Sequence, residues 1–465
     1  MIQQNFLTKL VAPVSVNFEI TDKCNLSCSF CFNANQEYQS QFVKEKFIPV
    51  RIANENATSH RIGVLDRLQQ MCKILDKLSD AGVFEVRFFG GEFTVFKYWR
   101  ELIKYAGEKG FFISFVSNGY LFLDDDIDYL ARYGVSSCSI SLHGNESIHD
   151  SIVGKKGSYS RAMDTIKRLQ KVGITVSVVY TPCAENSFQI YSFVQELKEC
   201  YGVSNFGINR LFHDERYENL VLTDYLRLLV DIKKCYLELG VNISLSDSLP
   251  RCVVPVRFWP YLSYCSQGVG FAQVDFNGRI KHCSATSVPL GNILEQELNE
   301  LWGEPLESMR SLKHLPMLCR ICPIFCGGGC SASRGVEKQF APDEFIPWPS
   351  EERWLSAVRK TAYNQGRKII FDVLVKPKFK RNKEIPRVLA EKPVVAFRYK
   401  LRLESDGQYL VMFEKRGIRM LSPLAAQILV LLDGTRTIEE IVQECVNNDL
   451  LCNRTEVEEI AKALV

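Results

Sequence analysis

Three cysteines close together near the N-terminus constrain this chain more than any other feature. Cys24, Cys28 and Cys31 follow one another with three and then two residues between them, a C-x3-C-x2-C spacing. They come just after the alternating apolar stretch 14–20, which predicts a β-strand, so the thiols lie on the loop that leaves its end. Three thiolates on one short loop can hold three irons of a 4Fe–4S cube and leave the fourth iron open to a small molecule.

Spacing alone leaves zinc or plain buried thiols open as other uses of these cysteines, because structural zinc sites also use thiolates, usually four of them. A disulfide framework is not expected. The chain has 17 cysteines, but its first residues lack the basic and apolar pattern of an export signal.

The C-x3-C-x2-C spacing, followed by the aromatic Phe32, resembles the signature of the radical S-adenosylmethionine (SAM) enzymes. This resemblance implies that SAM binds the open iron through its amino and carboxylate groups. Reductive cleavage of SAM in that family gives methionine and a 5′-deoxyadenosyl radical, which takes hydrogen from unactivated C–H bonds. The protein then has to position the cofactor and exclude competing reactions.

The composition is that of a soluble globular protein with two or three domains: 465 residues, 46% hydrophobic and 24% charged. No apolar run is long enough to span a bilayer. The net charge of +3 is too small to indicate nucleic acid. We therefore expect a cytoplasmic protein with neither a membrane nor a nucleic-acid partner.

Strand-like and helix-like stretches alternate over residues 1–240. The expected strands are 14–20, 83–89, 111–117, 136–142, 174–181 and 205–211, with an amphipathic helix after each. Such alternation predicts parallel strands joined by right-handed crossovers. Six units are too few for a closed eight-stranded barrel, so the predicted fold class is α/β with a partial (β/α)6 TIM-like barrel. Its chemistry is expected at the C-terminal ends of the strands.

Polar and glycine-rich turns close these strands. Gly90-Gly91-Glu92 looks like the family's GGE motif, although a plain strand-to-helix turn would also explain it. The resemblance implies SAM contacts by Gly90, Gly91, Glu92, Ser117, Asn118, Ser139, Ser141 and Asn186. His143 stands where the family usually has Asp, and it is a weak candidate for proton transfer beside the plain reading of a loop histidine.

A second cysteine group, in residues 241–350, looks like a SPASM domain, which carries auxiliary iron–sulfur clusters; two zinc sites could use the same thiols. The resemblance implies that Cys265, Cys283 and Cys330, with Cys252 as candidate fourth ligand, hold auxiliary cluster I. It also implies that Cys319, Cys322 and Cys326 hold auxiliary cluster II. The chain departs from the family pattern in two ways: three residues rather than five separate Cys322 from Cys326, and no cysteine follows Cys330 where the family has one. Asp343 is the candidate replacement; otherwise cluster II keeps an open iron or is absent.

Residues 351–393 read as a helix and basic linker, and residues 394–465 as a small winged-helix-like α+β domain. Its expected parts are a hairpin around Asp406-Gly407 and helices starting at Ser422, Thr437 and Thr455, the last two with capping boxes to Glu440 and Glu458. The last helix is acidic and would repel DNA. The sequence of residues 394–465 resembles a PqqD-like recognition element of ribosomal peptide (RiPP) maturation. Such a domain binds a leader peptide as a strand added to the edge of its sheet.

The predicted protein is a radical SAM/SPASM enzyme that modifies a ribosomally synthesised precursor peptide, for example by a thioether, C–C or C–O cross-link. Its leader peptide would bind at 394–465, and flavodoxin or ferredoxin would supply electrons. An anaerobic sulfatase-maturase-like oxidase is the alternative enzyme and would not need the tail. A peptide-binding Fe–S electron carrier that does not cleave SAM is the alternative outside that class.

Overall fold

The computed structural model describes residues 10–31, 58–211, 218–263, 265–286, 289–311, 313–320, 326–330, 343–346, 389–395, 397–414, 416–448 and 450–465. The chain forms two compact units, one of Ala12–Lys376 and one that joins Met1–Val11 to Pro377–Val465. Most of the predicted linker, residues 351–388, lies outside the described residues. Within the described part of the chain, no helix has the length and apolar character that a membrane span requires.

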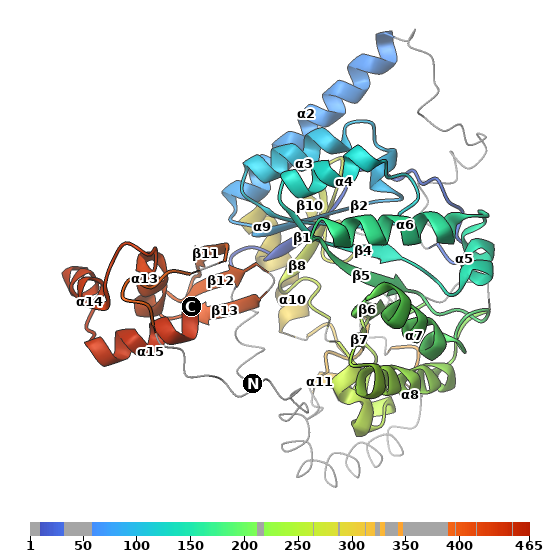
Figure 1. Cartoon of the computed structure of the whole chain (residues 1–465). Helices are drawn as coiled ribbons and strands as arrows, with labels where there is room; N and C mark the ends of the chain where they lie inside the picture. The colour runs from blue at the N-terminus through green and yellow to red at the C-terminus, as the bar shows by residue number, and fades with distance from the viewer. Residues whose placement is uncertain are drawn as a thin grey trace. The chain divides into compact units, whose positions relative to one another are not determined.

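The larger unit contains the six strands that the sequence predicts, in the predicted order. They are β1 (Ser15–Glu19), β2 (Glu85–Phe89), β3 (Phe112–Ser117), β4 (Val135–Ser141), β5 (Thr175–Tyr180) and β6 (Asn205–Ile208). Each strand pairs with the next in parallel, as right-handed crossovers between consecutive units require. The predicted α/β partial barrel is therefore confirmed, and Figure 1 shows its strands and helices alternating from blue to green.

Helices follow these strands and bury the apolar face of the sheet. They are α2 (Thr58–Asp80), α3 (Trp99–Glu108), α4 (Asp124–Arg132), α6 (Ser158–Lys171), α7 (Ile190–Tyr201) and α8 (Leu222–Leu239). On β1, Val16 and Phe18 are fully buried in the same core as Met71 of α2. Because side chains alternate along a strand, Asn17 and Glu19 lie on the opposite, polar face.

The sheet continues beyond the six predicted strands at both edges. Strand β7 (Asn242–Leu245) pairs with β6, and β8 (Phe271–Asp275) pairs in parallel with β1. Strands β9 (Arg279–Lys281) and β10 (Gly291–Asn292) complete a ten-stranded sheet. Strands β8 and β9 form an antiparallel hairpin, with Gly278 at a φ of 84° in its turn. The cysteine-rich segment therefore begins with strands of the barrel's own sheet.

A short helix, α5 (Glu146–Val153), is not predicted by the sequence analysis. Its N-cap is Asn145, whose side chain accepts a hydrogen bond from Ile148 N, and it ends at Gly154 with a φ of 67°. A left-handed residue of this kind is the usual end of a helix, and glycine adopts it without strain.

The smaller unit has a three-stranded antiparallel sheet and three described helices. They are β11 (Tyr399–Leu403), β12 (Tyr409–Phe413), β13 (Gly417–Leu421), α13 (Pro423–Leu431), α14 (Ile438–Asn447) and α15 (Arg454–Leu464). Its core includes Val411, Phe413, Ile428 and Ile441. The predicted hairpin is confirmed, whereas β13 is not predicted, because its first three residues are exposed and show no apolar alternation.

Two of the three predicted helix starts in this unit are confirmed. Ser422 caps α13, and Thr437 and Glu440 form the reciprocal capping box of α14. The capping box from Thr455 to Glu458 is wrong. Helix α15 begins one residue earlier, and Asn453 Oδ1 accepts the hydrogen bond from Glu456 N at 3.0 Å.

Replacing the true cap should destabilise the last helix. We expect Asn453→Ala to lower the free energy of opening α15 by about 1 kcal/mol, because the N-terminal amide of Glu456 loses its acceptor. Thr455→Ala is the matched control and should change it by less than about 0.5 kcal/mol. Amide hydrogen exchange of α15 in the full chain measures both, and a larger effect from Thr455→Ala would restore the predicted cap.

Candidate active site

The loop that carries Cys24, Cys28 and Cys31 is held from below by helix α5. Ser27 N donates to the carbonyl of Val153 at 3.1 Å, and Ser29 N donates to that of Ile152 at 3.0 Å. A Cβ on Gly154 would lie 2.5 Å from Ser27 Oγ, so only glycine allows this approach. The last carbonyls of α5, which lack partners inside the helix, thus bind the backbone between the cysteines.

Gly90 and Gly91 hold the start of the same loop. Gly91 N donates to Thr21 O at 2.9 Å, and Glu92 N donates to Lys23 O at 2.8 Å. A Cβ on Gly90 would lie 2.2 Å from Thr21 O, and one on Gly91 would lie 2.4 Å from Lys23 O. Both glycines are therefore needed where the backbone after β2 meets the backbone that leads to Cys24.

Glu92 is buried, and its carboxylate is surrounded by donors of this chain. Oε1 accepts from Thr94 Oγ1 at 2.7 Å and from Ser117 Oγ at 2.9 Å, and Oε2 accepts from Asn118 N at 2.8 Å. Burial raises the pKa of Glu92, while the hydrogen bonds from Asn118, Thr94 and Ser117 lower it. In this arrangement the carboxylate fastens the end of β3 to the turn after β2.

Asn118 links the hydrogen bonds of Glu92 to the cysteine loop. Its Nδ2 donates to Asn25 Oδ1 at 2.8 Å and lies 3.9 Å from Cys24 Sγ. Its Oδ1 accepts from Tyr120 N at 3.0 Å, which fixes the orientation of the amide. The predicted SAM-binding residues Glu92, Ser117 and Asn118 thus form one network that ends at the first cysteine.

The chemistry of the donor set fits an iron–sulfur cluster. Burial raises the pKa of Cys24 to about 12, with contributions from Glu92 and the other two thiols, and burial with Cys31 raises that of Cys28 to about 12. Such thiols stay protonated unless a cation binds them, as an iron cluster does. Beside them, Asn25 Nδ2 is buried without a partner in the described structure, so a donor for a bound group is present.

His143 is buried and neutral. Burial, with a contribution from His149, lowers the pKa of His143 to about 3. Thr181 N donates to its Nδ1 at 3.3 Å, and its ring packs edge-on against Phe30 of the cysteine loop, with centroids 4.9 Å apart. These contacts place His143 as a packing residue under the loop, and its lowered pKa keeps the imidazole uncharged near neutral pH.

Asn186 also serves the loops of the barrel. Its Nδ2 donates to the carbonyls of His143 at 3.0 Å and Thr181 at 3.1 Å, and its Oδ1 accepts from Cys183 N at 2.6 Å. Ser139 and Ser141 lie half-buried on one face of β4. Of the predicted SAM contacts beyond β3, the two serines are therefore the more accessible.

The second cysteine group surrounds the end of the larger sheet. Cys283 follows β9 and is buried, Cys265 is exposed, and Cys252 lies in a 3-10 turn, η4 (Arg251–Val253). Burial, together with the neighbouring Cys265 thiol, raises the pKa of Cys283 to about 12. A Cβ on Gly329 would lie 2.8 Å from Pro250 Cγ, which brings the turn before Cys330 next to the turn of Cys252.

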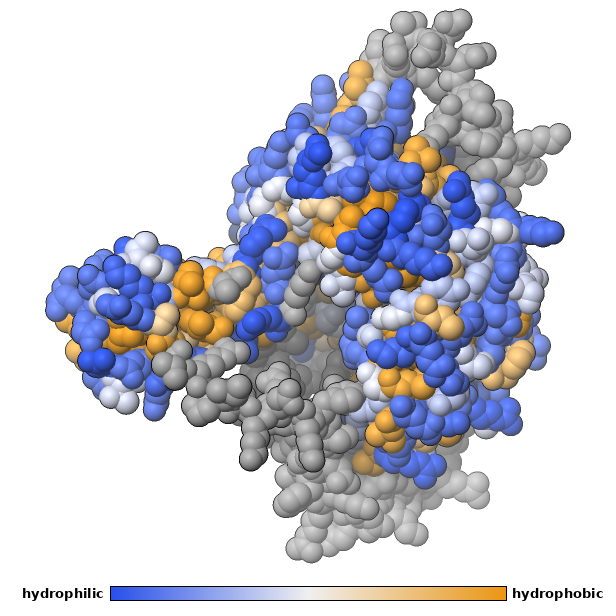
Figure 2. Space-filling model, in the orientation of Figure 1, coloured by the Kyte–Doolittle hydropathy of each residue, from blue (hydrophilic) through white to orange (hydrophobic). Residues whose placement is uncertain are grey.

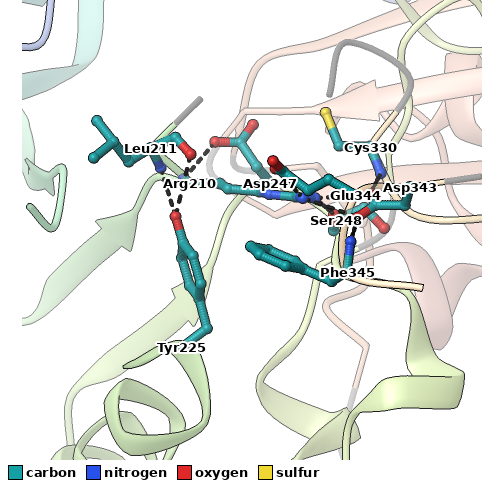
Figure 3. Close-up of polar contacts among 9 residues, drawn as sticks. All are labelled: Arg210, Leu211, Tyr225, Asp247, Ser248, Cys330, Asp343, Glu344 and Phe345. Carbon is teal, nitrogen blue, oxygen red and sulfur yellow. Dashed lines mark hydrogen bonds and ion pairs between the residues drawn. The ribbon is translucent and has the colours of Figure 1, made fainter. Parts of the chain in front are cut away.

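The remaining predicted ligands are less completely described. Cys319 is half-buried in α11 (Met317–Arg320), Cys326 is half-buried, and Cys322 lies outside the described residues. Asp343 is fully buried and faces Arg210 and the backbone of Cys330 (Figure 3). Over the ranges that the structure describes, no three Cys, His, Asp or Glu side chains converge as ligands of a single metal ion.

Replacing the Glu92 carboxylate tests whether its hydrogen bonds stabilise the contact between the end of β3 and the turn after β2. Glu92→Gln keeps the shape but turns one acceptor into a donor that faces a buried N–H or hydroxyl, which costs about 1–3 kcal/mol. Denaturant unfolding of the full chain measures this loss. Glu85→Gln on β2, whose carboxylate accepts from Ser114 Oγ, is the matched control and should cost less. An equal free energy of unfolding for Glu92→Gln and the wild type would show that the hydrogen bonds of Glu92 contribute nothing to stability.

Comparisons with known proteins agree with this site. Residues 18–184 match the radical SAM superfamily and residues 265–323 match SPASM, an iron–sulfur cluster-binding domain. The sporulation killing factor maturation protein SkfB of Bacillus subtilis is 23% identical over 304 residues, which are 63% of this chain and 65% of SkfB. The subtilosin biosynthesis protein AlbA of the same organism is 27% identical over 203 residues, 42% of this chain and 39% of AlbA. The matched stretch thus spans less than two thirds of either relative.

The fold is similar to that of SuiB from Streptococcus suis. The structure of SuiB with SAM superposes with a TM-score of 0.56 at 18% identity, covering 75% of this chain and 80% of SuiB. SuiB has also been solved with its precursor peptide SuiA, with a TM-score of 0.56 at 16% identity, covering 75% of this chain and 79% of SuiB. The predicted enzyme class and its SAM and iron–sulfur cofactors are confirmed at the level of these domains. The chain carries a radical SAM enzyme domain at residues 18–184 and a SPASM iron–sulfur domain at residues 265–323.

Proposed function

We propose that this chain modifies a ribosomally synthesised precursor peptide by SAM-dependent radical chemistry, forming a cross-link such as a thioether, C–C or C–O bond. The observation that carries the proposal is the loop of Cys24, Cys28 and Cys31. It is held rigidly at the end of β1 by the Gly90–Gly91 backbone and by α5, beside the buried unpaired donor Asn25 Nδ2. Cys24, Cys28 and Cys31 would hold a cluster that, with SAM bound and an external electron donor, would supply radical chemistry for removing a hydrogen atom from the peptide.

The residues of this chain bind and orient these groups. Cys24, Cys28 and Cys31 would hold the cluster, and Asn118 Nδ2, 3.9 Å from Cys24 Sγ, would donate to that sulfur. The half-buried hydroxyls of Ser139 and Ser141 lie on one face of β4 and are the candidate partners of the SAM ribose. The buried His143 ring, packed against the half-buried Phe30 of the loop, would keep water from this side of the loop.

The names of the relatives support a peptide substrate. SkfB is named for the maturation of a sporulation killing factor and AlbA for the biosynthesis of the bacteriocin subtilosin, and SuiB has been solved with its precursor peptide SuiA. The SPASM segment supports auxiliary clusters as additional electron carriers for an oxidative bond-forming reaction. Flavodoxin or ferredoxin would supply the electron that starts the reaction, and the cytoplasm is where such a donor acts.

We further propose that the smaller unit binds the leader of the precursor. Strand β13 is an edge of the three-stranded sheet, and its first three residues are exposed. Among the described strands none pairs with the outer side of β13, and an edge with an exposed apolar side chain such as Ile418 suits β-augmentation by an extended peptide. Figure 2 shows hydrophobic residues gathered over the strands of this unit. The acidic start of α15 argues against DNA as the ligand.

Removing the three thiols tests the proposed chemistry. Anaerobically reconstituted and dithionite-reduced enzyme should form 5′-deoxyadenosine from SAM. A variant with Cys24→Ala, Cys28→Ala and Cys31→Ala should form none, because the cluster that reduces SAM has lost its ligands. Cys200→Ala, at an exposed thiol on α7, is the control and should leave the yield unchanged. Equal yield from the triple variant would contradict the assignment, and cleavage of SAM without any peptide product would favour a different substrate.

Blocking the edge of β13 tests the leader site. Ile418→Asp places a charge on the side chain that is 46% exposed, and it should weaken binding of the precursor encoded beside the gene at least tenfold, about 1.4 kcal/mol. Fluorescence anisotropy with labelled precursor measures this in the full-length enzyme. Leu451→Asp, at a side chain that is 97% exposed outside the sheet, is the matched control. Unchanged affinity in both variants, and in a chain truncated before Val394, would remove the leader role and favour the sulfatase-maturase-like alternative.

A further inference from the structure

Arg210 lies two residues beyond the end of β6, and its side chain is fully buried. Its Nη1 donates to Asp343 Oδ2 at 2.8 Å and its Nη2 to Asp343 Oδ1 at 2.9 Å, so the two groups form a two-pronged ion pair across 133 positions of the chain (Figure 3). Both side chains have no exposed surface. A paired geometry of this kind gives direction as well as strength to the contact.

The Asp343 carboxylate has no acceptor position left for a metal. Oδ2 also accepts from Cys330 N at 2.9 Å, and Oδ1 also accepts from Phe345 N at 3.2 Å. Each oxygen thus receives two donors, which is the usual capacity of a carboxylate oxygen. Coordination of iron by Asp343 would require at least one of these buried hydrogen bonds to break.

The barrel side of the pair is fixed by the ends of two strands. Arg210 N donates to Asp247 Oδ2 at 2.8 Å, and its Nη1 donates to the carbonyl of Ser248 at 3.2 Å, two and three residues after β7 ends. Its guanidinium also lies over the ring of Phe345, 4.3 Å from the centroid. Contacts with Asp247 and Ser248 thus hold Arg210 in place independently of Asp343.

On the auxiliary side, the pair determines where Cys330 lies. The Cys330 N–H is held by the carboxylate, and a Cβ on Gly329 would lie 2.4 Å from Asp343 Oδ2, so the turn can approach only with glycine there. We propose that the Arg210–Asp343 pair positions Cys330 as a ligand of auxiliary cluster I, and that Asp343 is not a ligand of auxiliary cluster II.

This inference rests on the proposed use of Cys330 as a cluster ligand, and its test measures cluster content rather than peptide modification. Removing one member of a buried ion pair leaves the other charge unpaired, whereas removing both does not. We therefore expect Arg210→Gln and Asp343→Asn each to lose about four irons per reconstituted chain, one cube. The double variant should lose no more than either single variant. The low-temperature EPR signal of the SAM-bound cluster on Cys24, Cys28 and Cys31 should remain in all three, which shows that the barrel is folded.

Asp124→Asn is the matched control, because Asp124 also pairs with an arginine, Arg168, but is 95% exposed; it should lose no iron. Arg210→Gln is the decisive variant. If Asp343 were a ligand of auxiliary cluster II, freeing it from Arg210 would preserve both auxiliary clusters, and only Asp343→Asn would change the EPR signal of cluster II. That result overturns the proposal, as does full iron content in both single variants. Loss of the EPR signal of the SAM-bound cluster in Arg210→Gln also overturns the proposal, because the Arg210–Asp343 pair would then be needed for folding of the whole barrel. A chain that passes this test but leaves the precursor unmodified would fail only the proposed function.

Discussion

The close approach of the Gly90–Gly91 backbone to residues 21–23 decides where the reactive loop of this protein lies. With Cβ positions only 2.2 and 2.4 Å from carbonyl oxygens of Thr21 and Lys23, no other residue type fits there. The two amides of Gly91 and Glu92 then bind those carbonyls and set the direction in which the chain leaves β1. Helix α5 and Asn118 make the other contacts of the cysteine loop, and these contacts hold residues that follow the segment bound by Gly91 and Glu92.

Several polar residues that a sequence pattern associates with cofactor binding have structural contacts of their own. Glu92 joins β2 to β3, Asn186 ties the loop after β5 to His143, and Asp343 joins Arg210 to Cys330. Buried polar groups must find partners, and at the strand ends the nearest partners are neighbouring loops. The same network that would hold the cofactors therefore also holds the loops in register.

The strands and the first cysteine group could be predicted because their signals are local. Alternation along residues 15–19 or 175–180 and the spacing of Cys24, Cys28 and Cys31 do not depend on distant parts of the chain. The parallel pairing of β8 with β1 joins residues more than 250 positions apart, and no local pattern indicates it. Helix α5 has only eight residues, too few for a clear helical repeat of apolar side chains in the sequence.

The role of Asp343 could not be predicted for a similar reason. In the sequence it stands where the family pattern has a cysteine, so a ligand was the natural hypothesis. Its partner Arg210 lies 133 positions earlier and carries no recognisable motif. Likewise, Asn453 and Thr455 are both good N-caps by type, and only the backbone at Asn453, with a φ of −123° and a ψ of 168°, shows which one starts the helix.

The central claim is that the loop of Cys24, Cys28 and Cys31 presents one open iron to SAM. Electron–nuclear double resonance of the reduced full-length enzyme with SAM labelled by 15N at its amino group and 17O at its carboxylate tests this most directly. The account predicts hyperfine couplings from both labels that disappear when the three cysteines are replaced by alanine. Couplings that persist in that variant, or their absence from a wild-type enzyme with a full cluster, would contradict it.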